Sequence, residues 1–257
     1  MKEYSVIIPV HEYNETVENL LRRAIDSVPE DMTMVIVCGT KEIATSLLPF
    51  SQPCRNCIIS SRGDSFSVLV NEGIDYVKRT FQDIKYAYLL EYDDEFNSIW
   101  FDEVKKEVND KPEVSVFMPL TEIIDFESNK FLSYGNEAPW ASSFSNEIGY
   151  IDNESLQQFF DFYLTGSVFN LRDWTYVGGL KESIKLSFWY EFLLRLTHNE
   201  KKAYVIPKLG YKHYVNRPNS LYDQYRETMT EEESQWWYNL ALEEYTYKKD
   251  RKKEYNN

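Results

Sequence analysis

Strand and helix patterns alternate along the first half of the chain. Nearly continuous apolar, β-branched runs predict strands that are buried on both faces. These runs are Tyr4–Val10, Met32–Cys38, Tyr86–Leu90 and Val114–Leu120, with a shorter strand expected at Cys57–Ile59. Between them, apolar residues recur at helical spacing over Val17–Val28, Phe66–Phe81 and Asn97–Val108. This order predicts a mostly parallel sheet with helices on both faces. Gly73 interrupts one of these helices, which indicates a close backbone approach.

The second half is less regular. Residues 121–152 mix Gly, Pro, Ser, Asn and aromatic residues, which predicts long loops or a short hairpin. Further helices are expected at Glu154–Tyr163, Leu186–His198 and Glu231–Tyr247. Short strands are expected at Ser167–Asn170, Ala203–Ile206 and Tyr211–Val215. The charged tail Lys248–Lys253 is expected to be solvated and frayed.

Composition narrows the classes of function. Asp and Glu number 42 against 28 Lys and Arg, which gives a formal net charge of −14. This charge argues against generic nucleic-acid binding, which needs a basic footprint, although it is compatible with one local basic groove. The 20 Tyr, 15 Phe and 6 Trp predict either a core and surface built on large rings or a cleft that stacks planar groups.

Targeting signals and cysteines point to a cytoplasmic protein. No run of ~18 apolar residues is present, so we expect no membrane-spanning segment. The N-terminus enters a strand pattern at once, without the pattern of a signal peptide. Cys54 and Cys57 form a lone CxxC, and neither Cys38 nor the distant histidines complete a recognisable zinc spacing. We therefore expect free thiols.

The sharpest chemical feature is the acidic run from Glu91 to Glu95, which contains Asp93 and Asp94 and follows a buried strand. Ligands of open α/β sheets bind outside the carboxyl ends of the strands. Adjacent carboxylates repel one another unless a positive charge compensates them, and Mg²⁺ prefers a few carboxylates together with substrate phosphates. The alternative is a solvated acidic loop that caps the next helix. Both interpretations remain open at this point.

Several short motifs occur in order over residues 4–221. They are Ser5–Val10, Tyr13–Glu15, Ala24–Val28, Asn71–Ile74, Leu89–Asp94, Gly166–Phe169, Val177–Ser183, Leu193–Leu196 and Asn219–Leu221. Together they resemble the family 2 glycosyltransferases of the GT-A fold. The resemblance implies an α/β fold with a Rossmann-like, mostly parallel central sheet flanked by helices and a C-terminal helical extension. It implies a glycosyltransferase domain over residues 1–225, with a nucleotide-sugar-binding half (1–120) and an acceptor half (121–225). Residues 226–257 would then form the C-terminal helix and basic tail.

The resemblance and the positions of polar residues give a set of candidate site residues. The candidate ligands of Mn²⁺ or Mg²⁺ on the donor diphosphate are Asp93, Glu91, Asp94 and His213. The candidate donor-binding residues are Pro9, Val10, His11, Glu12, Cys38, Asn71, Asp93 and Arg217. Arg217 is expected to neutralise the diphosphate. Trp140 and Gly179 are candidates for binding the acceptor, although a core role is an alternative for Trp140 and a structural role for His213.

Three departures from the family pattern leave the donor and catalysis open. Cys38 stands at the end of the second strand, where the family often places an acid that holds the donor base. Glu91 replaces the first Asp of the metal motif. Phe188–Glu191 stands where the family usually has the Glu-Asp pair that supplies the catalytic base, which leaves Glu191 as the candidate base. Because Arg195 follows Glu191 at i+4, an intrahelical ion pair is the alternative.

The favoured interpretation is the transfer of a sugar from a nucleotide-sugar donor, expected to be a UDP-sugar, to an acceptor hydroxyl. The resemblance implies metal dependence and inversion at the anomeric carbon. The alternative is a catalytically impaired, glycosyltransferase-like binding or scaffold protein. Nucleotidyl transfer is disfavoured, because no Gly-rich phosphate loop or Lys follows the first strand. A glycan, a lipid-linked sugar, a protein and a modified nucleic-acid base all remain open as acceptors.

Overall fold

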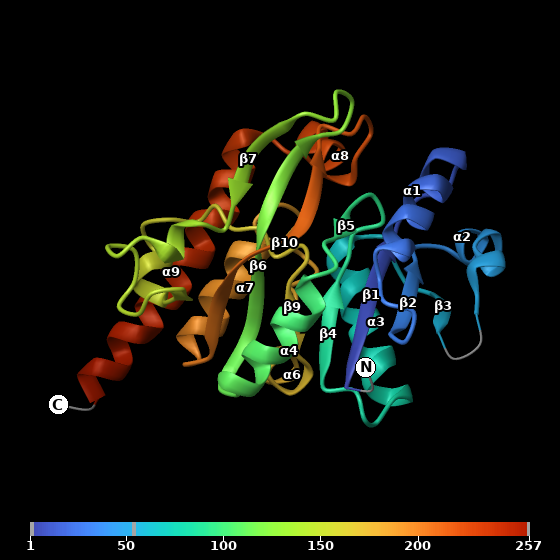
Figure 1. Ribbon diagram of the computed structural model, residues 1–257. Helices are drawn as coiled ribbons and strands as arrows, with labels where there is room; N and C mark the ends of the chain where they lie inside the picture. Colours follow the sequence, from blue (N-terminus) through green and yellow to red (C-terminus); the bar gives the residue numbers. More distant parts are fainter. Residues whose placement is uncertain (1–2, 53–54, 256–257) are drawn as a thin grey trace.

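The computed structural model describes residues 3–52 and 55–255, with side chains described through residue 245. Its strands form a ten-stranded sheet in the order β3-β2-β1-β4-β9-β6-β10-β5, with β7 paired to β6 and β8 paired to β10 (Figure 1). The strands are β1 (Tyr4–Val10), β2 (Thr33–Cys38), β3 (Asn56–Ser60), β4 (Tyr86–Leu89), β5 (Glu95–Phe96), β6 (Val114–Asp125), β7 (Phe131–Gly135), β8 (Tyr150–Ile151), β9 (Val168–Asn170) and β10 (Lys202–Val215).

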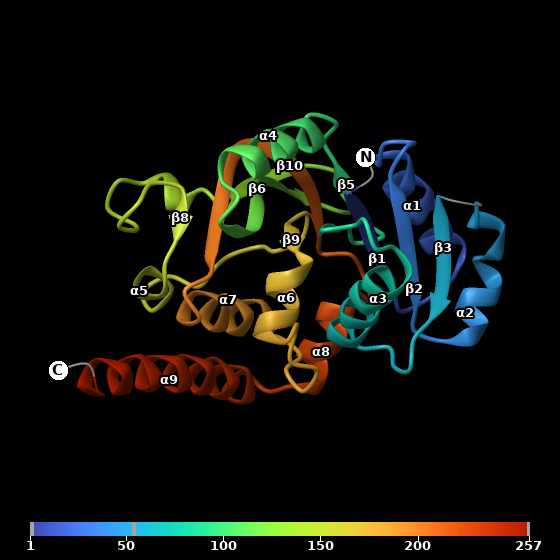
Figure 2. The same ribbon diagram turned by 90° about the horizontal axis from the view of Figure 1, so that it is seen from below.

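Helices cover both faces of this sheet. They are α1 (Glu15–Asp26), α2 (Lys41–Ser46), α3 (Phe66–Thr80), α4 (Trp100–Asp110), α5 (Asn153–Leu156), α6 (Leu171–Val177), α7 (Phe188–His198), α8 (Leu221–Thr228) and α9 (Glu231–Tyr255), with short 3₁₀ turns η1 (Leu48–Phe50) and η2 (Ala138–Trp140). Figure 2 shows α4 on one side of the sheet, and α3, α6 and α7 on the other.

Two apolar clusters fill the layers between the sheet and the helices. One contains Val17 of α1 and Trp100 of α4, and the other contains Leu69 of α3 and Phe192 of α7. Strand β1 supplies residues to both clusters, which explains its continuous apolar run. The prediction of an α/β sheet with helices on both faces is therefore confirmed.

Strand β1 is the point from which the sheet is extended in both directions: β2 and β3 lie on one side of it, and β4 lies on the other. This strand pairs in parallel with β2 on one side, where Val10 lies opposite Cys38, and with β4 on the other, where Ile7 lies opposite Leu89. In open α/β sheets, a crevice forms outside the carboxyl ends of the strands at such a point, and ligands bind there. The fold thus brings the chain after β1, β2 and β4 to one edge.

The pairing of the remaining strands refines the predicted sheet. Strand β9 is antiparallel and lies between β4 and β6, which the alternation of strand and helix signals did not predict. Strands β6 and β7 form an antiparallel hairpin, which confirms the hairpin alternative within residues 121–152.

Two predictions for the second half are wrong. The helix expected at Glu154–Tyr163 is only α5, because its aromatic residues beyond Leu156 pack on one another in a loop, as Phe159 does on Phe162, rather than along one helix face. The two strands expected at 203–206 and 211–215 are one strand, β10. Register shifts between Ile206 and Leu209, and between Leu209 and Tyr211, carry its pairing with β6 past the intervening Pro and Gly residues.

Three short helices, α2, α6 and α8, were not predicted, because each is too brief to show an apolar period. Helix α9 extends the last predicted helix through the charged tail, whose side chains lie outside the described residues, as does Cys54. Cys38 and Cys57 are free thiols, as expected. Within the described part of the chain, no helix combines the length and the apolar character that crossing a bilayer requires.

Candidate metal and nucleotide site

Three potential metal ligands meet at the carboxyl end of β4. Glu91, Asp94 and His213 each offer one ligand atom, and these atoms all lie within 4.8 Å of one another. The chain reverses after β4, and β5 pairs with β10, which brings the acidic loop against His213. His213 Nδ1 lies 2.8 Å from Asp94 Oδ2, and the backbone N–H of Tyr214 donates to Asp94 Oδ1 at 2.8 Å. The acidic loop is therefore held in place by β10.

The electrostatics of this group favour a cation. Burial and the neighbouring charge of Asp94 raise the pKa of Glu91 to about 8. Burial alone would lower the pKa of His213, but the Asp94 carboxylate raises it to about 9. Without a metal, Glu91 and His213 thus each carry a proton at neutral pH, and these protons offset the negative charge of the acidic loop. Carboxylates suit both Mn²⁺ and Mg²⁺, and imidazole is a ligand of first-row transition metals, so the residues fit a divalent cation.

A second cluster lies beside the first and is centred on Arg217. Its Nε donates to Asp93 Oδ2 at 2.7 Å, its Nη1 to Glu12 Oε1 at 2.9 Å, and its Nη2 to the hydroxyl of Tyr92 at 2.6 Å. Tyr92 in turn donates to Glu12 at 2.7 Å. Burial and then Asp94 raise the pKa of Asp93, although Arg217 opposes them. The assignment of Asp93 to the metal stays a prediction, since its carboxylate pairs with Arg217 and lies outside the three-residue group among the described residues.

The predicted donor residues after β1 line the same edge. Burial lowers the pKa of His11 to about 4, so its ring is uncharged at neutral pH. The ring lies 5.5 Å from that of Tyr92, and thus next to the Arg217 cluster. Pro9, Val10 and Cys38 are buried, and Val10 and Cys38 belong to the apolar core. Burial also raises the pKa of the Cys38 thiol to about 12, so its side chain serves the core rather than a polar ligand.

Asn71 of α3 lies against Gly179, which follows α6. The Asn71 amide donates to the carbonyl of Leu180 at 2.9 Å and accepts from its N–H at 2.9 Å. A Cβ on Gly179, whose φ is +66°, would lie 2.6 Å from Asn71 Oδ1. Asn71 therefore fixes the turn after α6, and these two predicted residues are neighbours.

Glu191 forms the ion pair that was the alternative to its role as a base. Its Oε1 lies 2.8 Å from Arg195 Nε, 3.1 Å from Lys181 Nζ and 2.6 Å from the hydroxyl of Tyr245. Burial raises the pKa of Glu191, but Arg195 outweighs it, and the net pKa is lowered. A carboxylate held in this way is a poor proton acceptor, so its role as a base stays a prediction without support from this geometry.

Trp140 also has a structural partner. Its indole Nε1 donates to the carbonyl of Val205 at 3.0 Å, and its ring packs on Tyr204 at 6.2 Å. These contacts place it at the amino-terminal part of β10, whereas His213 lies near the carboxyl end of that strand. The structure does not bring Trp140 together with the metal group.

Several residues that support the site were not predicted. Arg23 donates to the carbonyl of Asp93 at 2.7 Å and pairs with Glu95 at 3.0 Å. The backbone N–H of Glu91 donates to the hydroxyl of Tyr211 at 3.1 Å, and the ring of Tyr163 lies 5.6 Å from that of His213. No local pattern marks these residues, because each acts on a partner far away in the sequence.

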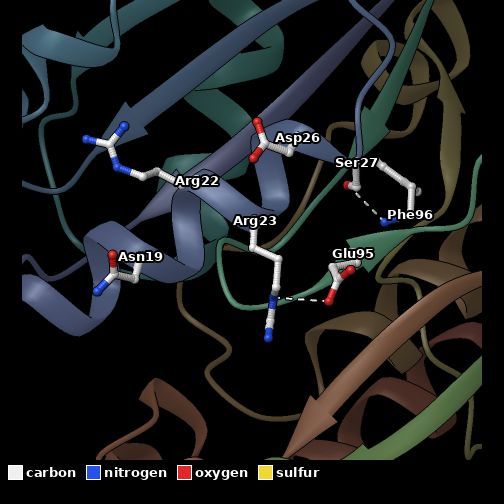
Figure 3. Close-up of a pocket in the computed structure, with 7 residues that line it drawn as sticks. All are labelled: Asn19, Arg22, Arg23, Asp26, Ser27, Glu95 and Phe96. Atoms are coloured by element: carbon white, nitrogen blue, oxygen red, sulfur yellow. Dashed lines mark hydrogen bonds and ion pairs between the residues drawn. The ribbon is translucent and has the colours of Figure 1, made fainter.

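Arg23 also lines a shallow hollow between α1 and β5, shown in Figure 3. The hollow has a volume of about 520 Å³, and Asn19, Arg22 and Phe96 are among its lining residues. The figure shows Arg23 directed at Glu95 and Ser27 directed at the N–H of Phe96. The hollow thus lies on the side of the acidic loop that faces α1, and the metal group is not among its lining residues.

The strand order and the acidic edge define an α/β protein of the GT-A type. Structures of S. aureus TarS are similar to this chain. TarS 1-349 in complex with UDP-GlcNAc gives a TM-score of 0.62 at 10% identity over 85% of this chain and 60% of that chain. TarS 1-349 gives 0.60 at 10% identity over 82% and 60%, and its complex with UDP gives 0.58 at 11% identity over 83% and 60%.

These similarities confirm the GT-A fold that the sequence motifs implied. The chain spans 60% of the length of the TarS 1-349 chains. No protein-family model and no curated protein sequence matches this chain.

Proposed function

We propose that the protein is a metal-dependent glycosyltransferase that uses a nucleotide-sugar donor. The observation that carries the proposal is the meeting of Glu91, Asp94 and His213 at the carboxyl end of β4, beside the point from which the sheet is extended in both directions. Support comes from the shared fold with TarS, whose structures include complexes with UDP-GlcNAc and UDP. Residues 1–120 would supply most of the donor site, to which His213 and Arg217 are added, and the rest of residues 121–225 would bind the acceptor.

Glu91, Asp94 and His213 would hold Mn²⁺ or Mg²⁺ in this proposal. A bound divalent cation neutralises the negative charge that builds on a departing nucleoside diphosphate. His213 would have to be neutral to act as a ligand, and Asp94, which its ring contacts, would be the neighbouring ligand. The backbone N–H of Tyr214 donates to the other oxygen of Asp94 and so orients its carboxylate.

Arg217 would supply the second positive charge to the diphosphate. Asp93, Glu12 and Tyr92 hold its guanidinium in one orientation, so little conformational entropy is lost when an anion binds. Asp93 would then act mainly by positioning Arg217. The expected donor is a UDP-sugar, with the base outside the ends of β1 and β2 near His11.

An inverting transfer needs a base on the acceptor side, and the described geometry around Glu191 favours a second candidate function. Glu191 is committed to Arg195, Lys181 and Tyr245, and Phe188 and Trp189 stand where the family has carboxylates. A glycosyltransferase-like protein that binds a nucleotide-sugar without transferring the sugar would have this arrangement. Hydrolysis of UDP-GlcNAc with Mn²⁺ would distinguish the enzyme from the binding protein.

The proposal is tested by calorimetric titration of UDP with and without Mn²⁺. We expect binding that depends on Mn²⁺, and we expect Asp94→Asn to weaken it at least tenfold, because a ligand and the partner of His213 are both changed. Asp102→Asn on the exposed face of α4 is the matched control and should bind as the unchanged protein does. Binding of UDP that is indifferent to Mn²⁺, or to Asp94→Asn, would contradict the metal assignment.

A further inference from the structure

Asp64 lies where the chain leaves the carboxyl ends of three neighbouring strands, β1, β2 and β3. This residue follows β3, and Gly39 follows β2 directly. A Cβ on Gly39 would lie 3.0 Å from the Cβ of Asp64 and 3.6 Å from the Cα of His11, which follows β1. Asp64 and His11 therefore flank Gly39 at the edge where the proposed nucleotide site lies.

Asp64 carries a free carboxylate at this edge. Its side chain is exposed, and no described residue donates a hydrogen bond to it or forms an ion pair with it. Arg62, two residues earlier, is engaged elsewhere, with Glu72 at 2.8 Å and with Glu182. An uncompensated carboxylate repels phosphate, so this end of the crevice suits an uncharged part of a nucleotide.

His11 supplies an unfilled hydrogen-bonding position beside Asp64. Its Nε2 is buried and has no hydrogen-bond partner among the described residues, and Glu12 Oε1 lies 3.7 Å away, beyond hydrogen-bond distance. Asp64 lies close enough for its charge to act on the His11 ring. A buried polar atom without a partner is costly, and a ligand that pairs with it removes this cost.

An aromatic side chain lies near Asp64. Tyr225 on α8 lies beside the main chain of Phe66, and the charge of Asp64 reaches its hydroxyl. Its ring also lies 5.4 Å from Lys185 Nζ. A ring near a carboxylate offers a stacking surface beside a hydrogen-bond acceptor, which suits a planar heterocycle.

We propose that Asp64 recognises the base of the nucleotide donor and selects uracil and guanine over cytosine and adenine. This inference rests on the proposed use of a nucleotide-sugar. It assigns the base to the ends of β1, β2 and β3, and the diphosphate to Arg217 and the metal group at the ends of β4 and β10.

The selectivity follows from the proton on the ring nitrogen. Uracil carries N3–H and guanine carries N1–H, and each donates to a carboxylate. Cytosine N3 and adenine N1 have a lone pair at the corresponding position, which a carboxylate oxygen repels. A hydrogen bond to a charged group changes affinity by roughly tenfold or more.

The test is a calorimetric comparison of UDP, GDP, CDP and ADP in the presence of Mn²⁺. We expect the unchanged protein to bind UDP and GDP roughly tenfold more tightly than CDP and ADP. In Asp64→Asn the amide can donate to a ring nitrogen, so the difference should fall to about twofold or reverse. Asp64→Ser should lose the preference without reversing it, which provides a second variant.

The matched control is Asp83→Asn, which changes an exposed Asp in the turn before β4, at the opposite edge of the sheet. It should keep the preference of the unchanged protein. An unchanged ranking of the four nucleotides in Asp64→Asn and Asp64→Ser would overturn the role of Asp64 while leaving the proposed function in place. Failure of all four to bind the unchanged protein would overturn the proposed function and this inference with it.

Discussion

At the scale of single residues, the site consists of two charge clusters that share the loop after β4. Asp94 faces His213, and Asp93, its neighbour in the chain, faces Arg217. These two successive carboxylates thus have different partners. Asp94 is directed toward β10, and Asp93 is directed toward Arg217, which follows β10 in the chain. This division explains how adjacent acids coexist in a buried loop. It also predicts that the two clusters contribute separately to binding and to stability.

Arg217→Lys tests the contribution of the second cluster. A lysine ammonium cannot reach Asp93, Glu12 and Tyr92 in the fork geometry of a guanidinium, so at least one buried partner is left unsatisfied. We expect the free energy of unfolding to fall by about 1–3 kcal/mol in urea titrations. The control is Arg22→Lys, because Arg22 is exposed and pairs with Glu18 on the surface, where such pairs contribute little. Equal losses in the two variants would show that Arg217 is not held as described.

At the scale of elements, β10 determines the geometry of the site. It carries His213 near its end, and three register shifts upstream set which of its residues face the acidic loop. Gly210 is required there, because a Cβ would lie 2.5 Å from the ring of Trp100 on α4. The indole of Trp100 donates to the carbonyl of Gly166, which ties α4 to the loop before β9. Packing on this one strand therefore connects the helix after the acidic loop to the site.

Gly73→Ala is predicted to destabilise the protein although it lies in a helix. Alanine normally favours a helix by about 0.5–1 kcal/mol over glycine. Here the added Cβ would lie 2.6 Å from Ile7 Cγ2 and 2.8 Å from Val37 Cγ2, so α3 would have to move away from β1 and β2. We expect a net loss of about 1–2 kcal/mol in urea unfolding.

Gly63→Ala is the matched control, since its Cβ would make an ordinary contact of 3.5 Å with Val68 Cγ1. Its stability should stay within about 0.5 kcal/mol of that of the unchanged protein. A stabilised Gly73→Ala would mean that helix propensity exceeds the cost of the clash. The close approach that the sequence indicated at Gly73 would then be tolerated by movement of the helix.

Local patterns predicted the elements that carry local signals. The parallel strands β1, β2 and β4 and helices α1, α3 and α7 follow from apolar runs and periods within each segment. The acids at Glu91 and Asp94 were found because they follow such a run directly. Register shifts in β10 and the insertion of β9 depend on pairing between distant segments, which no window of sequence contains. Asp64 was missed for the same reason, since only the folded chain brings it next to the ends of β1 and β2.

At the scale of the whole molecule, a buried charge network joins the C-terminal helix α9 to α7. Arg195 on α7 pairs with Glu191 and donates to the carbonyls of Val177 and Gly179. Tyr245 on α9 donates to the same Glu191 carboxylate. Tyr190 and Tyr238 stack at 4.5 Å beside this network. Helix α9 is therefore docked on α7 and, through Arg195, supports the turn that Asn71 fixes from the other side.

Glu191→Gln tests this docking and separates it from a catalytic role. Glutamine keeps the shape of the side chain but leaves the buried Arg195 charge without its carboxylate partner, whereas Lys181 is partly exposed and keeps Glu244. We therefore expect a loss of about 3 kcal/mol at pH 7. The folded pKa of Glu191 lies below its ordinary value of 4.5, mainly because of Arg195. The stability that its charge contributes is therefore complete above pH 4.5 and is lost as the pH falls through the folded pKa.

Urea unfolding of the unchanged protein and of Glu191→Gln from pH 7 to pH 3 measures this contribution. The difference between the two should be constant above pH 4.5 and should shrink below it. Glu103→Gln on α4, whose surface pair with Lys208 spans 3.4 Å, should differ little from the unchanged protein over the whole range. A difference that does not change with pH would show that the Glu191 charge does not hold α9. Normal stability of Glu191→Gln, combined with a rate of UDP-GlcNAc hydrolysis lowered by ~10²–10⁴, would instead return Glu191 to the role of a catalytic base.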